Sequence, residues 1–354
     1  MKNRRLASGL LAVGLAIAGA HAEKYVHAED TSGAGVKWHP GHYIMVRGAI
    51  PDVLYEEKVF LGVQKIYNWK ALEPQKGRYD FSSIKGDLAV LEKRGKRLVV
   101  QVQTKAFGEG RNVAPAYLQG PEYGGGVYKT STGSFNPVIW NDAVNDRMIA
   151  LYQALGKELN SEVYLEAVVL PETAPSSNIG RVPQPGVDLY THEKFVGALK
   201  RQMKALKEAF PNTVVIQYTN FPREALQELT DYQKEIGVGL GGPDVRPYDP
   251  GLGDPKSAVY RFYPQLAGIV PLGAAVQSPD YTIRRHNGPF EPTPVKEIYE
   301  FGRDKLRLNY MFWFDRPGYF DKVVKMMKEP LFPKDVAGGL DARRPQKLAA
   351  VSPK

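Results

Sequence analysis

Carboxylate and amide side chains follow several short apolar runs of this 354-residue sequence, and these side chains could carry chemistry. Glu172, Asp244 and Asp280 are the carboxyl candidates for catalysis, because a carboxyl group can exchange a proton or attack an electrophilic carbon. Gln277 lies three residues before Asp280. Its amide can hydrogen-bond to a substrate, but it carries no full charge and cannot form a glycosyl ester.

The ends of the same runs also carry aromatic and amide side chains. The candidate binding residues are Trp69, Gln103, Tyr218, Asn220 and Trp313. Aromatic faces stack on the apolar faces of sugar rings, while amides bind hydroxyl groups, and binding sites combine apolar walls with a few polar groups in this way. A phosphate ester would favour clustered Arg and Lys or a helix N-terminus. The mixture therefore favours a carbohydrate.

The apolar runs themselves predict eight strands that alternate with helices. They cover His42–Val46, Val63–Tyr67, Arg97–Val102, Val163–Val169, Val214–Tyr218, Gly237–Leu240, Ile269–Val276 and Arg307–Phe312. Most are continuously apolar, as in a parallel sheet that is covered on both faces. Eight such units over about 290 residues predict a single-domain α/β fold, the (β/α)8 TIM barrel, across residues 40–333. In that fold the chemistry lies at the carboxyl ends of the strands.

An open, doubly wound sheet is the structural alternative to the barrel. Its nucleotide-binding versions lose support, because neither GxGxxG after the first strand nor GxxxxGK[ST] occurs. The sequence has no cysteine, which excludes disulfides, thiolate metal sites and a cysteine nucleophile. Its six histidines show no metal-ligand spacing. We therefore expect no metal and no cofactor.

Both ends of the sequence differ from the barrel segment. Residues 1–22 combine basic residues, an apolar run and the small residues Ala20 and Ala22, which predicts a signal peptide that is cleaved after Ala22. We thus expect a periplasmic or secreted protein with no membrane span in its mature chain, because no later run approaches about 18 apolar residues. Residues 23–39 form a lead-in. Residues 334–354 lack periodicity and predict a flexible, basic surface tail.

The net charge of +9 first suggests a nucleic-acid or polyanion partner. Three of these charges belong to the leader, and three more belong to residues 334–354, which hold five basic and two acidic residues. Because the barrel segment is only mildly basic and lacks a basic helix or an RNP-like motif, the sequence disfavours nucleic acid. A neutral or mildly anionic glycan is compatible with it.

A resemblance adds to this interpretation. The run Tyr67–Phe81, YNWKALEPQKGRYDF, resembles the "W…lEP.kG.YdF" segment after strand two in (β/α)8 glycoside hydrolases of the large retaining clan that includes cellulases and β-galactosidases. The resemblance covers residues 40 to 330. It implies that Glu172, at the end of strand four, is the general acid/base, and that Trp313 lies at the end of strand eight. Within this segment we expect Glu73 on the solvent side.

Two positions depart from that pattern. Pro171 stands where the family has an asparagine before the acid/base glutamate. Gln277 stands where the family has its nucleophilic glutamate, so a second carboxylate must come from elsewhere. Asp244 and Asp280 are the candidates: a separation of about 5–5.5 Å from Glu172 suits a retaining nucleophile, and about 6.5–9.5 Å suits an inverting base. In a third route, Gln277 would orient the amide of an N-acetyl sugar that acts as its own nucleophile.

Each candidate also has a structural interpretation. Glu172 could cap a loop, Gln277 could be a core amide, and the aspartates could form turns. The tryptophans and Tyr218 could be packing residues. The sequence thus leaves an exported glycoside hydrolase that acts on a polysaccharide or oligosaccharide, and a degenerate barrel that binds glycans without cleaving them.

Overall fold

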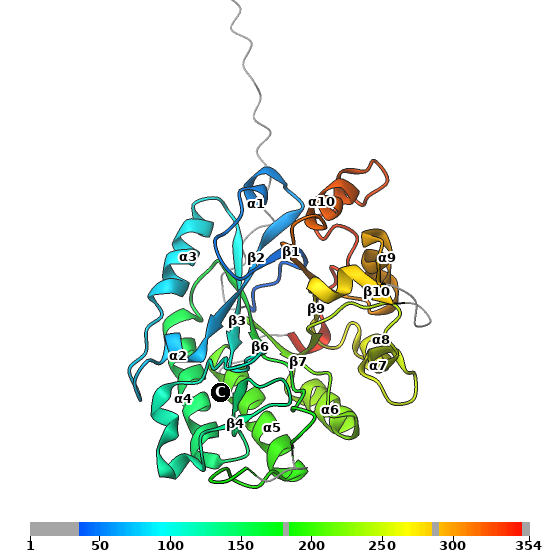
Figure 1. Ribbon diagram of the computed structural model, residues 1–354. Helices are drawn as coiled ribbons and strands as arrows, with labels where there is room; N and C mark the ends of the chain where they lie inside the picture. Colours follow the sequence, from blue (N-terminus) through cyan, green and yellow to red (C-terminus); the bar gives the residue numbers. More distant parts are fainter. Residues whose placement is uncertain (1–34, 180–183, 285–289, 349–354) are drawn as a thin grey trace, which may run out of the picture. The chain divides into compact units, whose positions relative to one another are not determined.

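Eight strands close into a parallel barrel in the computed structural model, which describes residues 35–179, 184–284 and 290–348 (Figure 1). These strands are β1 (Gly41–Val46), β2 (Phe60–Asn68), β3 (Arg97–Gln103), β6 (Leu165–Leu170), β7 (Val214–Tyr218), β8 (Gly239–Gly242), β9 (Leu272–Val276) and β12 (Tyr310–Phe314). Strands consecutive in the chain pair with each other, and β12 closes the barrel against β1. The predicted (β/α)8 fold is confirmed. The expected signal peptide lies outside the described residues.

Helices follow the strands and cover the outside of the barrel (Figure 1). They are α1 (Val53–Glu56), α2 (Trp69–Leu72), α3 (Ser82–Glu92), α4 (Asp142–Leu159), α5 (His192–Ala209), α6 (Leu226–Ile236), α7 (Pro250–Gly253), α8 (Tyr263–Leu266), α9 (Val295–Glu300) and α10 (Phe320–Lys328). The Asn141 side chain caps α4 by accepting the Val144 N–H, and the Thr191 side chain caps α5 by accepting the Lys194 N–H. Gly237 ends α6 with a φ of 72°, where its missing Cβ avoids strain.

Two short hairpins interrupt the β/α alternation. β4 (Val127–Lys129) pairs with β5 (Phe135–Pro137), and β10 (Thr282–Arg284) pairs with β11 (Phe290–Pro292). The first hairpin lies in a long connection, residues 104–141, between the carboxyl end of β3 and α4. The sequence did not predict these hairpins, because three-residue strands have no readable period.

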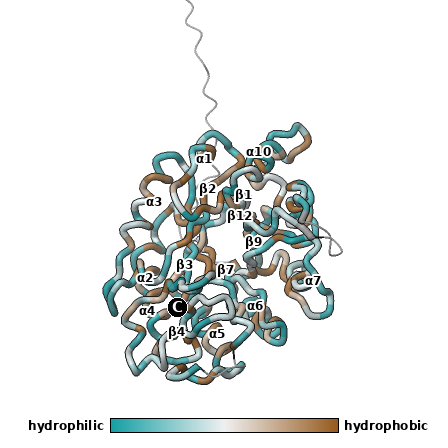
Figure 2. The backbone as a smooth tube through the Cα atoms, in the orientation of Figure 1, coloured by the Kyte–Doolittle hydropathy of each residue, from teal (hydrophilic) through white to brown (hydrophobic). Residues whose placement is uncertain are grey.

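Buried apolar side chains form two layers, one inside the barrel and one between the strands and the helices. In Figure 2, where the backbone is coloured by hydropathy, hydrophobic stretches run along the central strands. The inner layer contains Tyr43, Met45, Val99, Ala167, Val169, Val214, Ile216, Tyr218, Ala275, Tyr310 and Phe312. Successive strand side chains point to opposite faces, so Met311 and Trp313 belong to the outer layer. This alternation decides which side chains can reach the mouth of the barrel, the end at which the carboxyl ends of the eight strands lie.

A buried ion cluster closes the amino end of the barrel. The Glu166 carboxylate lies 2.8 Å from His39 Nδ1 and 3.6 Å from Arg97 Nη1, and it accepts a 2.7 Å hydrogen bond from the Tyr310 hydroxyl. Burial alone would raise the pKa of Glu166, but the hydrogen bond and charge of His39, with the charge of Arg97, lower it to about 2. Glu166 is therefore a structural carboxylate and not a site acid.

The C-terminal segment packs against the barrel, and the expectation of a flexible tail is wrong for residues 334–348. Leu340 and Leu348 are buried, and Leu348 joins the inner layer. The Ala342 carbonyl accepts a hydrogen bond from Trp38 Nε1, and the Gly338 carbonyl accepts one from Tyr299. Apolar residues too widely spaced to form a period supply this packing, which is why the sequence pattern did not predict it. Residues 349–354 lie outside the described residues.

Leu348→Ala is expected to lower the free energy of unfolding by about 2–4 kcal/mol, because it removes buried methyl groups and leaves a cavity. Leu331→Ala is the matched control, since Leu331 is 96% exposed, and it should change that free energy by less than about 0.5 kcal/mol. Urea unfolding measures both. Equally small changes would contradict the packing of this segment.

Candidate active site

Glu172 lies two residues after the end of β6, where a residue that follows β7 fixes its carboxylate. Asn220 Nδ2 donates a 2.6 Å hydrogen bond to Glu172 Oε2, while Asn220 Oδ1 accepts the Ala174 N–H at 3.1 Å. The Thr173 N–H donates to the Tyr218 carbonyl, which continues the pairing of the two strand ends. Glu172 Oε1 accepts no hydrogen bond from any residue that the structure describes. One oxygen of the half-buried carboxyl is thus anchored and the other is available.

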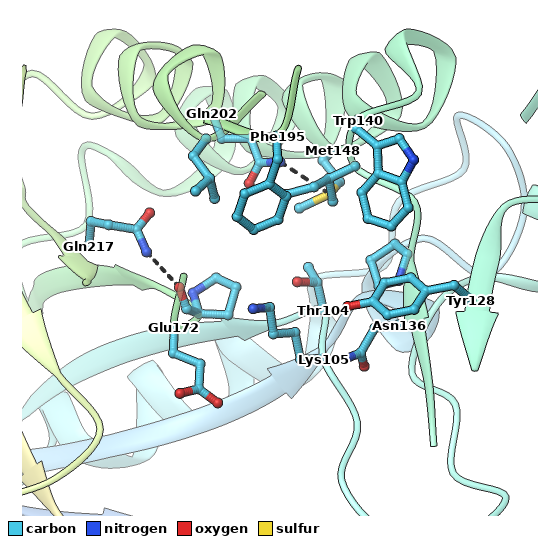
Figure 3. Close-up of a pocket in the computed structure, with 14 residues that line it drawn as sticks. Thr104, Lys105, Tyr128, Asn136, Trp140, Met148, Glu172, Phe195, Gln202 and Gln217 are labelled. Atoms are coloured by element: carbon cyan, nitrogen blue, oxygen red, sulfur yellow. Dashed lines mark hydrogen bonds between the residues drawn. The ribbon is translucent and has the colours of Figure 1, made fainter. Parts of the chain in front are cut away.

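Lys105 lies beside Glu172 in the wall of a small cavity (Figure 3). Its ammonium is buried and donates a hydrogen bond to the Ala174 carbonyl. Burial lowers the pKa of Lys105 to about 8, and the nearby negative charge of Glu172 partly offsets this effect. The sequence analysis missed this residue, although it stands two positions after the end of β3.

The same cavity lies between the carboxyl ends of β3 and β6 and the helices α4 and α5. Trp140, Phe195 and Met148 form its apolar side, opposite Lys105 and Glu172 (Figure 3). The cavity therefore gives the two charged side chains an apolar neighbour, which strengthens the electrostatic interaction between them.

Asp244 follows β8, and its half-buried carboxyl interacts with the carboxyls on both sides. Burial, followed by the negative charge of Glu172, raises the pKa of Asp244 to about 6. The charge of Asp244 in turn acts on Asp280. Asp280 Oδ1 is buried 3.7 Å from Arg246 Nε, and no described residue forms a hydrogen bond with it.

Asp280 lies deeper than Asp244, and its side chain is buried. Burial and the charge of Asp244 raise the pKa of Asp280 well above its usual range. Its Oδ2 accepts the backbone N–H groups of Gln277, at 2.7 Å, and Val245, at 3.1 Å. It thereby ties the end of β9 to the end of β8. These bonds make Asp280 a positioning residue and leave Asp244 as the carboxyl whose pKa responds to the charge of Glu172.

Gln277 follows β9 and faces a cation. Its Oε1 accepts a 3.3 Å hydrogen bond from Arg47 Nη2, at the end of β1. It is half-buried, so the interpretation as a core amide is not supported. No carboxylate among the described residues accepts a hydrogen bond from the Gln277 side chain.

Trp69 and Trp313 do not lie at the mouth, and their expected stacking roles are wrong. Both are fully buried in the outer layer. Trp69 Nε1 donates to Glu73 Oε2 at 3.0 Å, and Trp313 Nε1 donates to His42 Nδ1 at 3.0 Å. Trp313 is the fourth residue of β12 and points outward, whereas Phe314 packs against the inner layer and reaches the mouth.

Glu73 is also buried, against the expectation that it faces solvent. It forms an ion pair with Arg147 of α4 and accepts hydrogen bonds from Trp69 and Tyr117. The motif that resembles the glycosidase segment therefore stabilises the junction of β2 and α4 and takes no part in the site.

The amide candidates lie at different depths. Gln103 ends β3 and is half-buried, and alternation from Val99 points it and Gln101 to the inner face. Gln101 Oε1 is buried, and no described residue donates to it. Tyr218 is 1% exposed, and its hydroxyl accepts a 2.7 Å hydrogen bond from Gln64. Tyr218 thus supports the mouth from below, and a direct substrate contact is not supported.

Among the described residues, no group of three or more His, Asp or Glu side chains could hold a metal ion. None of the helices in the same residues is long and apolar enough to cross a membrane.

No protein-family model matches this sequence, and no curated protein matches it. The chain is similar in structure to endo-glycoceramidase II from Rhodococcus sp. in a complex with a cellobiose-like imidazole, with a TM-score of 0.53 and 12% identity over 80% of this chain and 76% of that one. A solved endogalactoceramidase gives a TM-score of 0.50 and 15% identity over 80% of this chain and 71% of that one. At such identity the likeness establishes the glycoside hydrolase barrel fold alone.

A carboxyl titration near pH 6 is expected for Asp244, and its pKa should fall in Glu172→Gln, because the variant removes a neighbouring negative charge. NMR of protein with ¹³C-labelled aspartate carboxyls measures this titration, with Asp244→Asn to identify the signal. Glu193→Gln, on the exposed first turn of α5, is the control and should leave the pKa unchanged. An equal pKa in all three proteins that keep Asp244 would contradict the interaction with Glu172.

Proposed function

We propose that this protein is an exported glycoside hydrolase that acts on a polysaccharide or oligosaccharide, with Glu172 as general acid/base and Asp244 as the second carboxyl group. One observation carries the proposal: Asn220 holds one oxygen of Glu172, whose charge also reaches the half-buried carboxyl of Asp244. Two carboxyl groups at the mouth of a barrel are the minimum that glycoside hydrolysis requires.

The chemistry divides between these carboxyls. Glu172 donates a proton to the glycosidic oxygen as the bond to the anomeric carbon breaks. The reaction uses the state in which the pair holds one proton, on Glu172, so that Asp244 is the carboxylate that attacks that carbon or removes a proton from the attacking water. Asp280 supports Asp244 by tying the end of β8 to the end of β9 through the backbone N–H groups of Val245 and Gln277.

The basic leader before Ala22 supports export, and the amide and aromatic side chains of the mouth support a carbohydrate substrate. Gln103 and Phe314 are the binding candidates at strand ends, together with Asn220 as the residue that orients Glu172.

A second candidate function is glycan binding without hydrolysis. Gln277 favours it, because this position carries the nucleophilic carboxylate in the glycosidases that the sequence resembles. In that case the three carboxyls would only shape the mouth and bind sugar hydroxyls.

Glu172→Gln is expected to lower kcat/KM by roughly 10²–10⁴-fold on a cognate glycan, because an amide cannot donate the proton that the leaving oxygen needs. Reducing-sugar release from a panel of polysaccharides measures the loss, and Glu193→Gln is the matched control that should keep full activity.

Two results would contradict the proposal. Equal activity of Glu172→Gln and wild type would remove Glu172 from the mechanism. Measurable glycan binding by the wild type with no turnover on any substrate of the panel would establish the second candidate function.

A further inference from the structure

Arg47 extends from the end of β1 at the mouth of the barrel and is exposed. Its guanidinium donates to the neutral amide oxygen of Gln277 at 3.3 Å and lies 5.1 Å from the centroid of the Phe314 ring. Throughout residues 35–179, 184–284 and 290–348, no carboxylate forms an ion pair with it. Its position is thus fixed on two sides while its charge is not neutralised.

A second arginine contacts the segment that follows β9, one residue beyond Gln277. Arg316 follows β12, the strand between β1 and β9 in the barrel, and donates to the carbonyl of Ser278. Its guanidinium lies 4.4 Å from the centroid of Tyr319, and it too forms no ion pair within the described part of the chain. Arg246, at the end of β8, differs, because it lies 2.6 Å from Asp249.

Two guanidiniums at the mouth thus form no ion pair within the described residues. Arg47 follows β1 and Arg316 follows β12, while Glu172 and Asp244 follow β6 and β8. The exposed Asp315 also follows β12, but it forms an ion pair with neither arginine among these residues. A carboxylate at position 277 would neutralise Arg47, but glutamine leaves the charge available. The planar guanidinium presents paired N–H donors that match the oxygens of a carboxylate or a sulfate.

We propose that the mouth takes a glycan with an anionic substituent, a sugar carboxylate or sulfate, which binds Arg47 and Arg316 beside the Gln277 amide. The proposal rests on the proposed function only in taking the mouth as the glycan site. The negative group lies on the β1 and β12 side, so that the scissile bond can lie over Glu172 and Asp244. The substrate would then be an acidic polysaccharide, such as one that contains uronic acids.

Binding, measured by calorimetry in the Glu172→Gln background, tests the proposal separately from hydrolysis. The probes are oligogalacturonate, an oligomannuronate, their carboxyl-reduced counterparts, a sulfated galactan oligosaccharide and polyglutamate. The variants are Arg47→Gln and the matched control Arg94→Gln. Arg94 precedes β3, at the opposite end of the barrel, and also lies 5.1 Å from an aromatic ring, that of Tyr55. Melting temperatures verify that both variants fold.

We expect an acidic oligosaccharide to bind, and Arg47→Gln to weaken its binding roughly tenfold or more, because a charge-assisted hydrogen-bond pair is lost. Arg94→Gln should leave it unchanged, and the carboxyl-reduced sugars should bind weakly to every variant. Binding of the uronates alone assigns the substituent as a carboxylate, and binding of the sulfated galactan alone assigns it as a sulfate. Equal binding of acidic and reduced sugars, equal losses in both variants, or equal binding of polyglutamate would overturn the proposal.

Discussion

The alternation of side chains along a closed parallel barrel is the constraint on which the site depends. Each barrel strand presents every second residue to the interior, and only the last inward residue reaches the mouth. On β12 this order brings Tyr310, Phe312 and Phe314 inward and sends Trp313 against the helices. A shift of one residue would exchange Phe314 for Trp313, and with it the aromatic surface that a ligand meets.

This constraint explains how much the sequence predicted. Mostly apolar runs predicted all eight barrel strands, since strands covered on both faces favour apolar residues on both faces. Glu172 and Asn220 were found because each lies two residues after such a strand. Trp313 was misplaced because the run predicted to end at Phe312 continues to Phe314, and an apolar run does not show which face each residue occupies. Lys105 and Arg47 were missed because their importance comes from neighbours distant in sequence.

The carboxyl groups at the mouth are electrostatically coupled, so the pKa of one depends on the charge of the next. Burial and the charge of Asp244 raise the pKa of Asp280, and burial and the charge of Glu172 raise the pKa of Asp244. Asp244 in turn interacts with Glu172, which Asn220 holds in place. The neutral amide of Gln277 removes a fourth carboxyl from this coupled group, and the cations at the ends of β1 and β12 give the mouth a polarity along which an acidic glycan would align. The barrel shared with endo-glycoceramidase II thus carries a different arrangement of charges from the one that the glycosidase resemblance implied.

Asp244, at the end of β8, is the carboxyl that we propose as the second catalytic group. The most direct measurement compares glycan turnover by the wild type, Asp244→Asn and Asp231→Asn, a control on the exposed face of α6. The account predicts that Asp244→Asn loses roughly 100-fold or more of kcat while Asp231→Asn retains it. Wild-type turnover by Asp244→Asn would contradict the account.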